Sequence, residues 1–278
     1  MTVTNAVETT MIWGTVSGAS MVGMVISLLL SVVLPIFLGI FIYKKTKAWV
    51  PAFFIGCGIF VGFAMILEQI CHAIVLTVTG SAIRDNIWLY AIYGGLAAAL
   101  FEECGRWIAM TFCLKKHLTR ENALMYGAGH GGIEAFLILG MSSMSNLLTA
   151  AMINGGLMEK TMTALEPAQQ EVTYHQLSVL WTTPAYQFYL APVERISAIA
   201  LQIALSILVY SAVKTGRKLH LAAAFGLHFA VDFLTVICAA AIPTWALELG
   251  LLLVVAVICV VVYQLVLSLI HISEPTRP

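Results

Sequence analysis

The sequence predicts an all-α protein, a bundle of about seven helices that cross a membrane. The chain has 278 residues, of which 60% are hydrophobic and only 10% are charged, whereas soluble domains carry about 25% charged residues. Seven apolar segments reach the roughly 20 residues that a helix needs to cross the hydrocarbon layer. This composition excludes soluble Rossmann and TIM-barrel enzymes, nucleic-acid-binding proteins and disordered regulators, because their surfaces need charge that the chain lacks.

The predicted spans form one integral membrane domain over residues 1–266, in a multi-pass protein of the cell membrane that contacts the lipid bilayer and no nucleic acid. Residues 1–16 contain no Lys or Arg. They therefore lack the basic region of a cleavable signal peptide, and the first span is expected to remain as an anchor. The predicted spans are residues 16–43, 51–79, 87–114, 123–153, 196–213, 219–242 and 245–267.

The chain ends in a polar segment, residues 267–278, that follows abruptly on a run of Val and Leu. Its back-translation fits the transposon-end adapter that is used in sequencing libraries. We therefore expect this tail to be non-native, and we leave His271 and Glu274 out of every candidate site.

Basic residues in the connections predict the orientation of the chain. Cytoplasmic connections of membrane proteins are enriched in Lys and Arg. Nine basic residues follow the first, third and fifth spans, whereas the opposite connections contain three, which predicts an outside N-terminus and an inside C-terminus. The first set is Lys44, Lys45, Lys47, Lys115, Lys116, Arg120, Lys214, Arg217 and Lys218, and the second is Arg84, Lys160 and Arg195.

One connection, residues 154–192, is much longer than the others. Loops of this length in compact proteins are usually functional or partly helical. Its aromatic clusters around Trp181 and Tyr186 suit the depth of the lipid headgroups. We expect an external loop with an interfacial helix or a lid; a connector without a role in any reaction is an equal alternative.

Several ionisable residues fall inside the apolar spans, where a buried charge costs about 2.5 to 3.5 kcal/mol or more. Such groups face a protein-lined interior, pair with one another or bind an ion. Three pairs are spaced four residues apart, so both members project from one helix face, as in helical metal or acid/base sites. The pairs are Glu68 and His72, His130 and Glu134, and His228 and Asp232.

The third span contains two consecutive acids, Glu102 and Glu103, followed by Arg106. Consecutive side chains point about 100° apart on a helix, so the two carboxylates cannot do the same work. Arg106 lies within one turn of both and can neutralise one of them, which leaves the other for chemistry. The alternative is that Arg106 compensates a buried acidic pair that only locks two helices together.

His130 lies among four glycines in the fourth span, which indicates close approach of another backbone or of a substrate. Packing of small residues between helices explains the glycines equally well, but not the histidine. His228 and Asp232 in the sixth span can satisfy each other, yet similar groups on two other helices favour one shared intramembrane site. Glu68 and His72 are expected to support that site, to form a separate proton relay, or to be a structural pair.

Taken together, the motifs resemble those of the YhfC-type membrane peptidases. These belong to a superfamily of intramembrane proteases with the CAAX prenyl-endopeptidases, the bacteriocin-processing proteins and the PrsW-type proteases. The resemblance covers the chain from about the second to the seventh span, with the motifs in the order of the family. They read Glu102-Glu103-x-x-Arg106, Gly-His130-Gly-Gly-x-Glu134 and His228-x-x-x-Asp232.

The resemblance implies that Glu102 and His130 activate a water, while His228 and Asp232 bind a metal or stabilise the oxyanion. The CAAX-protease branch usually places the Arg one residue later and ends the last motif in Asn. Because an ionised Asp cannot donate a hydrogen bond, Asp232 favours a metal ligand or a residue that orients His228.

The resulting hypothesis is an intramembrane protease, a hydrolase of metallo- or glutamate type, acting on a membrane protein or peptide. Glu102 is the general base, His130 relays the proton, and Glu103 with Arg106 holds the helix geometry. A divalent metal, zinc first, is the implied cofactor, and no nucleotide cofactor is expected. The metal-ligand candidates are Glu102, His130, His228 and Asp232, with Arg106, Glu134, Glu68 and His72 in support.

Two alternatives come from other classes of protein. A proton-coupled transporter can use a buried Glu/His relay, and an inactive membrane scaffold can bind partners through the same groove. The sequence contains no Gly-x-Ser-x-Gly elbow and no His-Glu-x-x-His helix, which argues against serine-elbow and zincin chemistry but leaves other metal chemistry open.

Overall fold

The computed structural model describes residues 11–273, with side chains for residues 11–265. Within this range all regular elements are helices, and seven helical spans are long and apolar enough to cross a membrane. The predicted fold class is confirmed. The side chains of the predicted non-native tail lie outside the described residues. The spans are Gly18–Thr46, Pro51–Thr79, Ile87–Cys113, Arg120–Asn154, Ala185–Thr215, Lys218–Ala239 and Thr244–Leu265.

Polar caps begin several of the spans. At the first, the Ser17 hydroxyl accepts the backbone N–H of Ser20 at 3.0 Å, and Asn86 and Thr119 cap the third and fourth in the same way. Such caps satisfy N–H groups that the first helical turn leaves unpaired. The elements of the spans are α1 (Gly18–Thr46); α2 (Pro51–Phe60), η1 (Val61–Glu68) and α3 (Gln69–Thr79); α4 (Ile87–Ile108) and η2 (Ala109–Cys113); α5 (Arg120–Ala135), η4 (Phe136–Gly140) and α6 (Met141–Asn154); α9 (Ala185–Thr215); α10 (Lys218–Ala239); and α11 (Thr244–Ser273).

Three of these spans contain π-helical turns, the segments η1, η2 and η4. A π-turn widens the helix and often occurs at functional sites. Here η1 ends at Glu68, and η4 begins two residues after Glu134. The wider turns therefore lie directly beside two of the buried acids.

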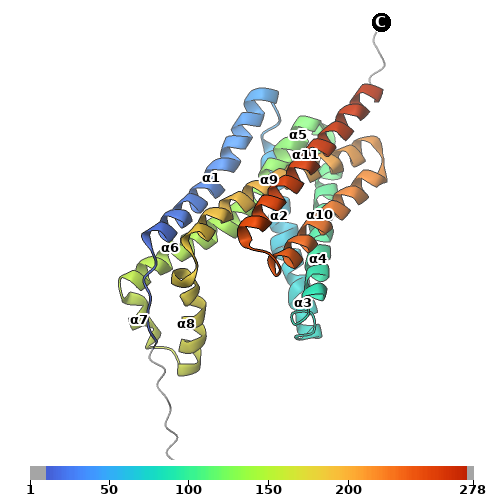
Figure 1. Cartoon of the computed structure of the whole chain (residues 1–278). Coiled ribbons are helices and arrows are strands. Elements are labelled where there is room, and N and C mark those ends of the chain that lie inside the picture. Colours follow the sequence, from blue (N-terminus) through green and yellow to red (C-terminus); the bar gives the residue numbers. More distant parts are fainter. Residues whose placement is uncertain (1–10, 274–278) are drawn as a thin grey trace, which may run out of the picture.

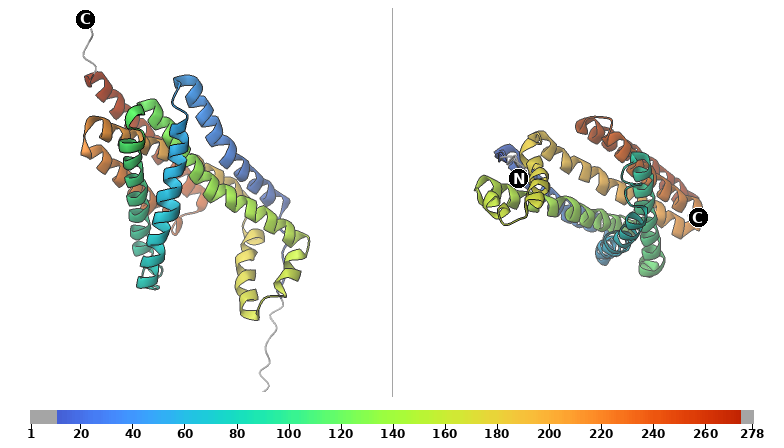
Figure 2. Two further views of the ribbon diagram at one scale, coloured as in Figure 1. Left: turned by 180° about the vertical axis from the view of Figure 1, so that it is seen from behind. Right: turned by 90° about the horizontal axis from the view of Figure 1, so that it is seen from below.

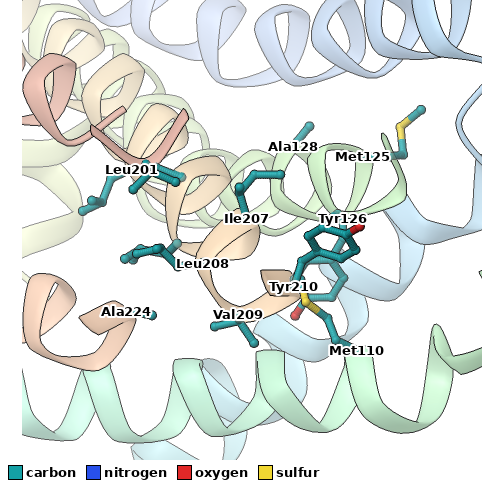
Figure 3. Close-up of a cluster of buried hydrophobic side chains, with 14 of the residues drawn as sticks. Met110, Met125, Tyr126, Ala128, Leu201, Ile207, Leu208, Val209, Tyr210 and Ala224 are labelled. Atoms are coloured by element: carbon teal, nitrogen blue, oxygen red, sulfur yellow. The ribbon is translucent and has the colours of Figure 1, made fainter. Parts of the chain in front are cut away.

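Helix α9 forms the centre of the bundle. In its most apolar window 72% of the residues are buried, against 17–33% in the other spans. A cluster of buried hydrophobic side chains joins α9 to α5 and includes Met110 and Ala224 of neighbouring spans (Figure 3). A polar side chain on α9 therefore faces protein rather than lipid, the condition under which polar groups persist at membrane depth.

The glycines around His130 let α5 pass closely between neighbouring helices. A Cβ atom at Gly129 would collide with the backbone carbonyl of Phe53 on α2, and one at Gly132 would lie 2.6 Å from Pro35 of α1. At Gly131 the nearest atoms, at 3.0 Å, belong to α9. The glycines therefore allow close packing of helices, with the close approach of another backbone that was predicted at Gly129.

The long connection predicted over residues 154–192 contains two helices, α7 (Leu157–Met162) and α8 (Pro167–Thr182). They extend away from the bundle at the end where α1 begins (Figures 1 and 2). The Trp13 ring contacts Tyr174 and Trp181 of α8 at centroid distances of 5.6 and 5.7 Å. A helical element in this connection was predicted correctly, and its external position stays a prediction.

The fifth span is longer than predicted, because α9 starts at Ala185 and continues through Pro192. The predicted span began at residue 196, after Pro192 and the charged residues Glu194 and Arg195, all of which lie inside this helix. Assigning Arg195 to a connection was therefore wrong, since it lies inside α9. The opposite connections keep Arg84 and Lys160, and the orientation of the chain stays a prediction.

Candidate functional site

The acids and histidines of three different spans come together beside α9. Glu102 on α4, His130 on α5 and His228 on α10 are buried, each with at most 6% of its surface exposed. The buried acids of α4 and α5 and the polar face of α10 border a cavity of about 230 Å³. The convergence predicted from the spacing of these residues is thus present in the fold. The charged and polar residues that line the cavity include Glu102, Glu134, Arg195, Gln202, His228 and Asp232.

Glu102, His130 and Glu134 form a compact group in the part of the chain that the structure describes. Each offers one ligand atom, and these atoms lie within 4.8 Å of one another. The Nε2 atom of His130 is 2.9 Å from Oε2 of Glu102. Glu134 was predicted in a supporting role, whereas its position makes it a candidate ligand.

The donor set of this group fits a divalent metal. One imidazole and two carboxylates are the nitrogen and oxygen ligands of catalytic zinc sites, which use three protein ligands and leave a fourth position open. Ligands about 2.1 Å from a common ion are at most about 4.2 Å apart, so small side-chain movements suffice to close the group. His228 and Asp232, the other two predicted ligands, lie outside it.

A second group consists of Glu103, His228 and Asp232. The Nδ1 atom of His228 is 2.8 Å from Oε1 of Glu103, while its Nε2 atom is 3.5 Å from Asp232 and 4.0 Å from Oε1 of Glu102. Asp232 was expected to orient His228, but the shorter contact comes from Glu103 on another helix. The side chain of Asp232 is 35% exposed, so it is the most exposed acid of this group.

Arg106 joins the two groups. Its side chain is fully buried and lies 3.5 Å from Oε1 of Glu103 and 3.9 Å from Oε2 of Glu102. The prediction that Arg106 lies close to both acids is therefore confirmed. Its closest contacts are with Gln202 on α9, whose backbone carbonyl accepts from Nη1 at 3.2 Å and whose side-chain oxygen accepts from Nη2.

Gln202, like Arg195, is a residue of this site that the sequence analysis missed. Its side-chain amide donates to Glu102 at 2.9 Å and to Glu134 at 2.8 Å. A single glutamine carries no charge, so it does not stand out among the acids and histidines of the spans. The available signal was an amide within an apolar stretch of the fifth span, where its groups need partners.

Arg195 and the pair Glu68 and His72 surround the site. Arg195 donates to Oε1 of Glu134 at 3.1 Å and also pairs with Glu194. His72 contacts Glu68 at 3.2 Å and the hydroxyl of Tyr93 at 2.7 Å. The pair is thus hydrogen-bonded within its own region, and the structure leaves open its predicted supporting role.

Comparison with known proteins identifies the family of the chain. The family model of the YhfC intramembrane metalloprotease matches residues 30–265. The chain belongs to this family. It is 41% identical over 222 residues to the uncharacterized membrane protein YhfC of Bacillus subtilis (strain 168), and the match covers 77% of this chain and 83% of that protein. No solved structure matches the chain.

The family assignment confirms the resemblance that the three motifs suggested. It also supports a membrane-embedded protein whose family is described as metalloproteases. The group of Glu102, His130 and Glu134 supplies a place where a metal of such a protein can be held.

Proposed function

We propose that the protein is an intramembrane metallopeptidase that hydrolyses a peptide bond of a membrane protein or peptide. The observation that carries the proposal is the buried group of Glu102, His130 and Glu134, two members of which line a cavity within the helix bundle. A family described as intramembrane metalloproteases supports the same reaction class.

Glu102, His130 and Glu134 would hold the metal, with zinc as the first candidate. When bound, a divalent cation polarises a carbonyl group and activates water for attack. Gln202 and Arg195 hydrogen-bond the two carboxylates, as partners of metal ligands commonly do. His228 and Asp232 then act on the substrate rather than as ligands.

Glu102 is the proposed general base. It takes a proton from the attacking water as the hydroxyl oxygen bonds to the carbonyl carbon, and the proton is passed to the amine nitrogen as the C–N bond breaks. The products are a carboxylic acid and an amine, and transfer of the acid's proton to the amine gives a carboxylate and an ammonium group. His130 was predicted to relay this proton; as a ligand of the metal it would instead hold the cation beside Glu102, from which its Nε2 atom is 2.9 Å away.

His228 is proposed to stabilise the oxyanion. Its Nδ1 atom is occupied by Glu103, so its Nε2 atom is the ring nitrogen left to face the cavity. A fixed donor aimed at developing negative charge is a large contribution to catalysis. Glu103 therefore acts as the residue that orients His228, which extends its predicted role in holding the helix geometry.

The cavity lies toward the end of the bundle that carries few basic residues. Its lining includes Glu194 from the early part of α9, Thr235 from the late part of α10 and Leu251 from the early part of α11. These residues extend the cavity toward that end, whereas Glu102, Glu134 and His228 lie in the interior of their spans, so cleavage would occur within the membrane.

The test compares the N-termini of membrane proteins, by mass spectrometry, in cells with and without the protein. We expect new N-termini inside or next to membrane spans only in cells that make it. Identical sets of N-termini, with the protein present in the membrane at normal level, would contradict the proposed function.

A further inference from the structure

Gln202 is held in one orientation by the groups around it. The Arg106 guanidinium can only donate hydrogen bonds and an ionised carboxylate can only accept them. The side-chain oxygen of Gln202 must therefore face Arg106, and its NH₂ group must face Glu102 and Glu134. The opposite orientation would place oxygen against carboxylates and NH₂ against Arg106.

The burial of Gln202 makes this arrangement rigid. Gln202 is 3% exposed and Arg106 is fully buried, so water does not compete for these hydrogen bonds. Arg106 also donates to the backbone carbonyl of Gln202 at 3.2 Å, which ties α4 to α9 at this point. Hydrogen bonds are stronger in such a low-dielectric interior, and unpaired groups there are costly.

The two carboxylates that Gln202 contacts come from different helices. Glu102 lies on α4 and Glu134 on α5, and they repel each other when both are ionised. The NH₂ group reaches both, at 2.9 and 2.8 Å, through one oxygen of each carboxylate. Because a carboxylate has two oxygens with about four lone-pair sites in all, these contacts leave acceptor capacity for a cation.

We propose that Gln202 is the positioning residue of the metal centre: Arg106 fixes its amide, and the amide sets the separation and orientation of Glu102 and Glu134. The inference rests on the proposed function, because it concerns the metal that these carboxylates would hold. Arg106 and Gln202 thus act together. Through them, a residue of α9 aligns Glu102 of α4 with Glu134 of α5.

The test is the dissociation constant for Zn²⁺, measured on purified protein in detergent by competition with a chromogenic chelator. The Gln202→Met variant keeps the length of the side chain and removes both amide functions. We expect it to bind Zn²⁺ about 10 to 100-fold more weakly than the wild type, the usual loss when a partner of a metal ligand is removed.

The matched control is Ser197→Ala, which lies on the same helix, is equally buried and bonds only to the carbonyl of Val193 in its own helix among the contacts described. It is expected to keep the wild-type Zn²⁺ affinity. Where Gln202→Met does not fold, Gln202→Asn replaces it. Its amide is one methylene too short to meet Arg106 and both carboxylates, so its affinity also falls.

A folded Gln202 variant with the wild-type dissociation constant would overturn this inference and leave the metal centre intact. A wild-type protein that binds no Zn²⁺ would overturn the proposed metal centre and the role of Gln202 with it. The two failures are therefore distinguishable in one titration.

Discussion

Replacing Glu102 by glutamine is expected to reduce peptide-bond cleavage by at least about 10²-fold. General-base catalysis contributes about 10² to 10⁴-fold, and the substitution removes both the base and one of the three proposed metal ligands while keeping the size of the side chain. Glu102 is also the acid that contacts His130, Gln202 and Arg106. The measurement is the abundance of the new N-termini in membranes of cells that make each variant.

The control for this experiment is Glu171→Gln, on the exposed surface of α8 outside the bundle. It is expected to leave cleavage unchanged. Cleavage at the wild-type rate in the Glu102→Gln variant, at equal protein level, would remove Glu102 from the mechanism and favour a transporter or scaffold.

Replacing Arg106 by alanine is expected to destabilise the fold by about 3–5 kcal/mol. Removing one partner of a buried ion pair leaves an uncompensated charge, which has this cost. Arg106 is fully buried between Glu102 and Glu103, so its loss leaves two carboxylates without their shared cation. The measurement is unfolding in mixed detergent, followed by circular dichroism.

Two further variants make this prediction specific. Arg106→Lys keeps the charge but lacks the planar guanidinium that donates to Gln202 and reaches both acids. We therefore expect a loss of stability smaller than that of Arg106→Ala. Arg217→Ala removes an exposed arginine in the connection between α9 and α10 and should be neutral. Wild-type stability of Arg106→Ala would show that the buried acids are not ionised together.

Much of the fold followed from composition and apolar length. Lipid forces long apolar segments to be helices, so all seven spans were predicted. The start of α9 was not, because Pro192 and the charges after it resemble the end of a span. Arg195 is tolerated inside the helix because it pairs with Glu134, a contact between distant segments that the sequence does not reveal.

The residue types of the site were predictable, but their pairing was not. Spacing of four residues showed that His228 and Asp232 share a helix face, yet His228 bonds Glu103 on another helix. Such contacts depend on how two helices are rotated against each other. Similarly, Glu134 joins Glu102 and His130 because α4 and α5 both face α9, which also brings Gln202 between the acids.

The central claim is that Glu102, His130 and Glu134 hold a divalent metal. Elemental analysis of the detergent-purified protein tests it most directly, with the wild type, His130→Ala and His228→Ala measured side by side after their folding is checked by gel filtration. We expect stoichiometric metal in the wild type and in His228→Ala, and its loss in His130→Ala. Wild-type protein without metal, or metal that is lost in His228→Ala and kept in His130→Ala, would contradict the claim.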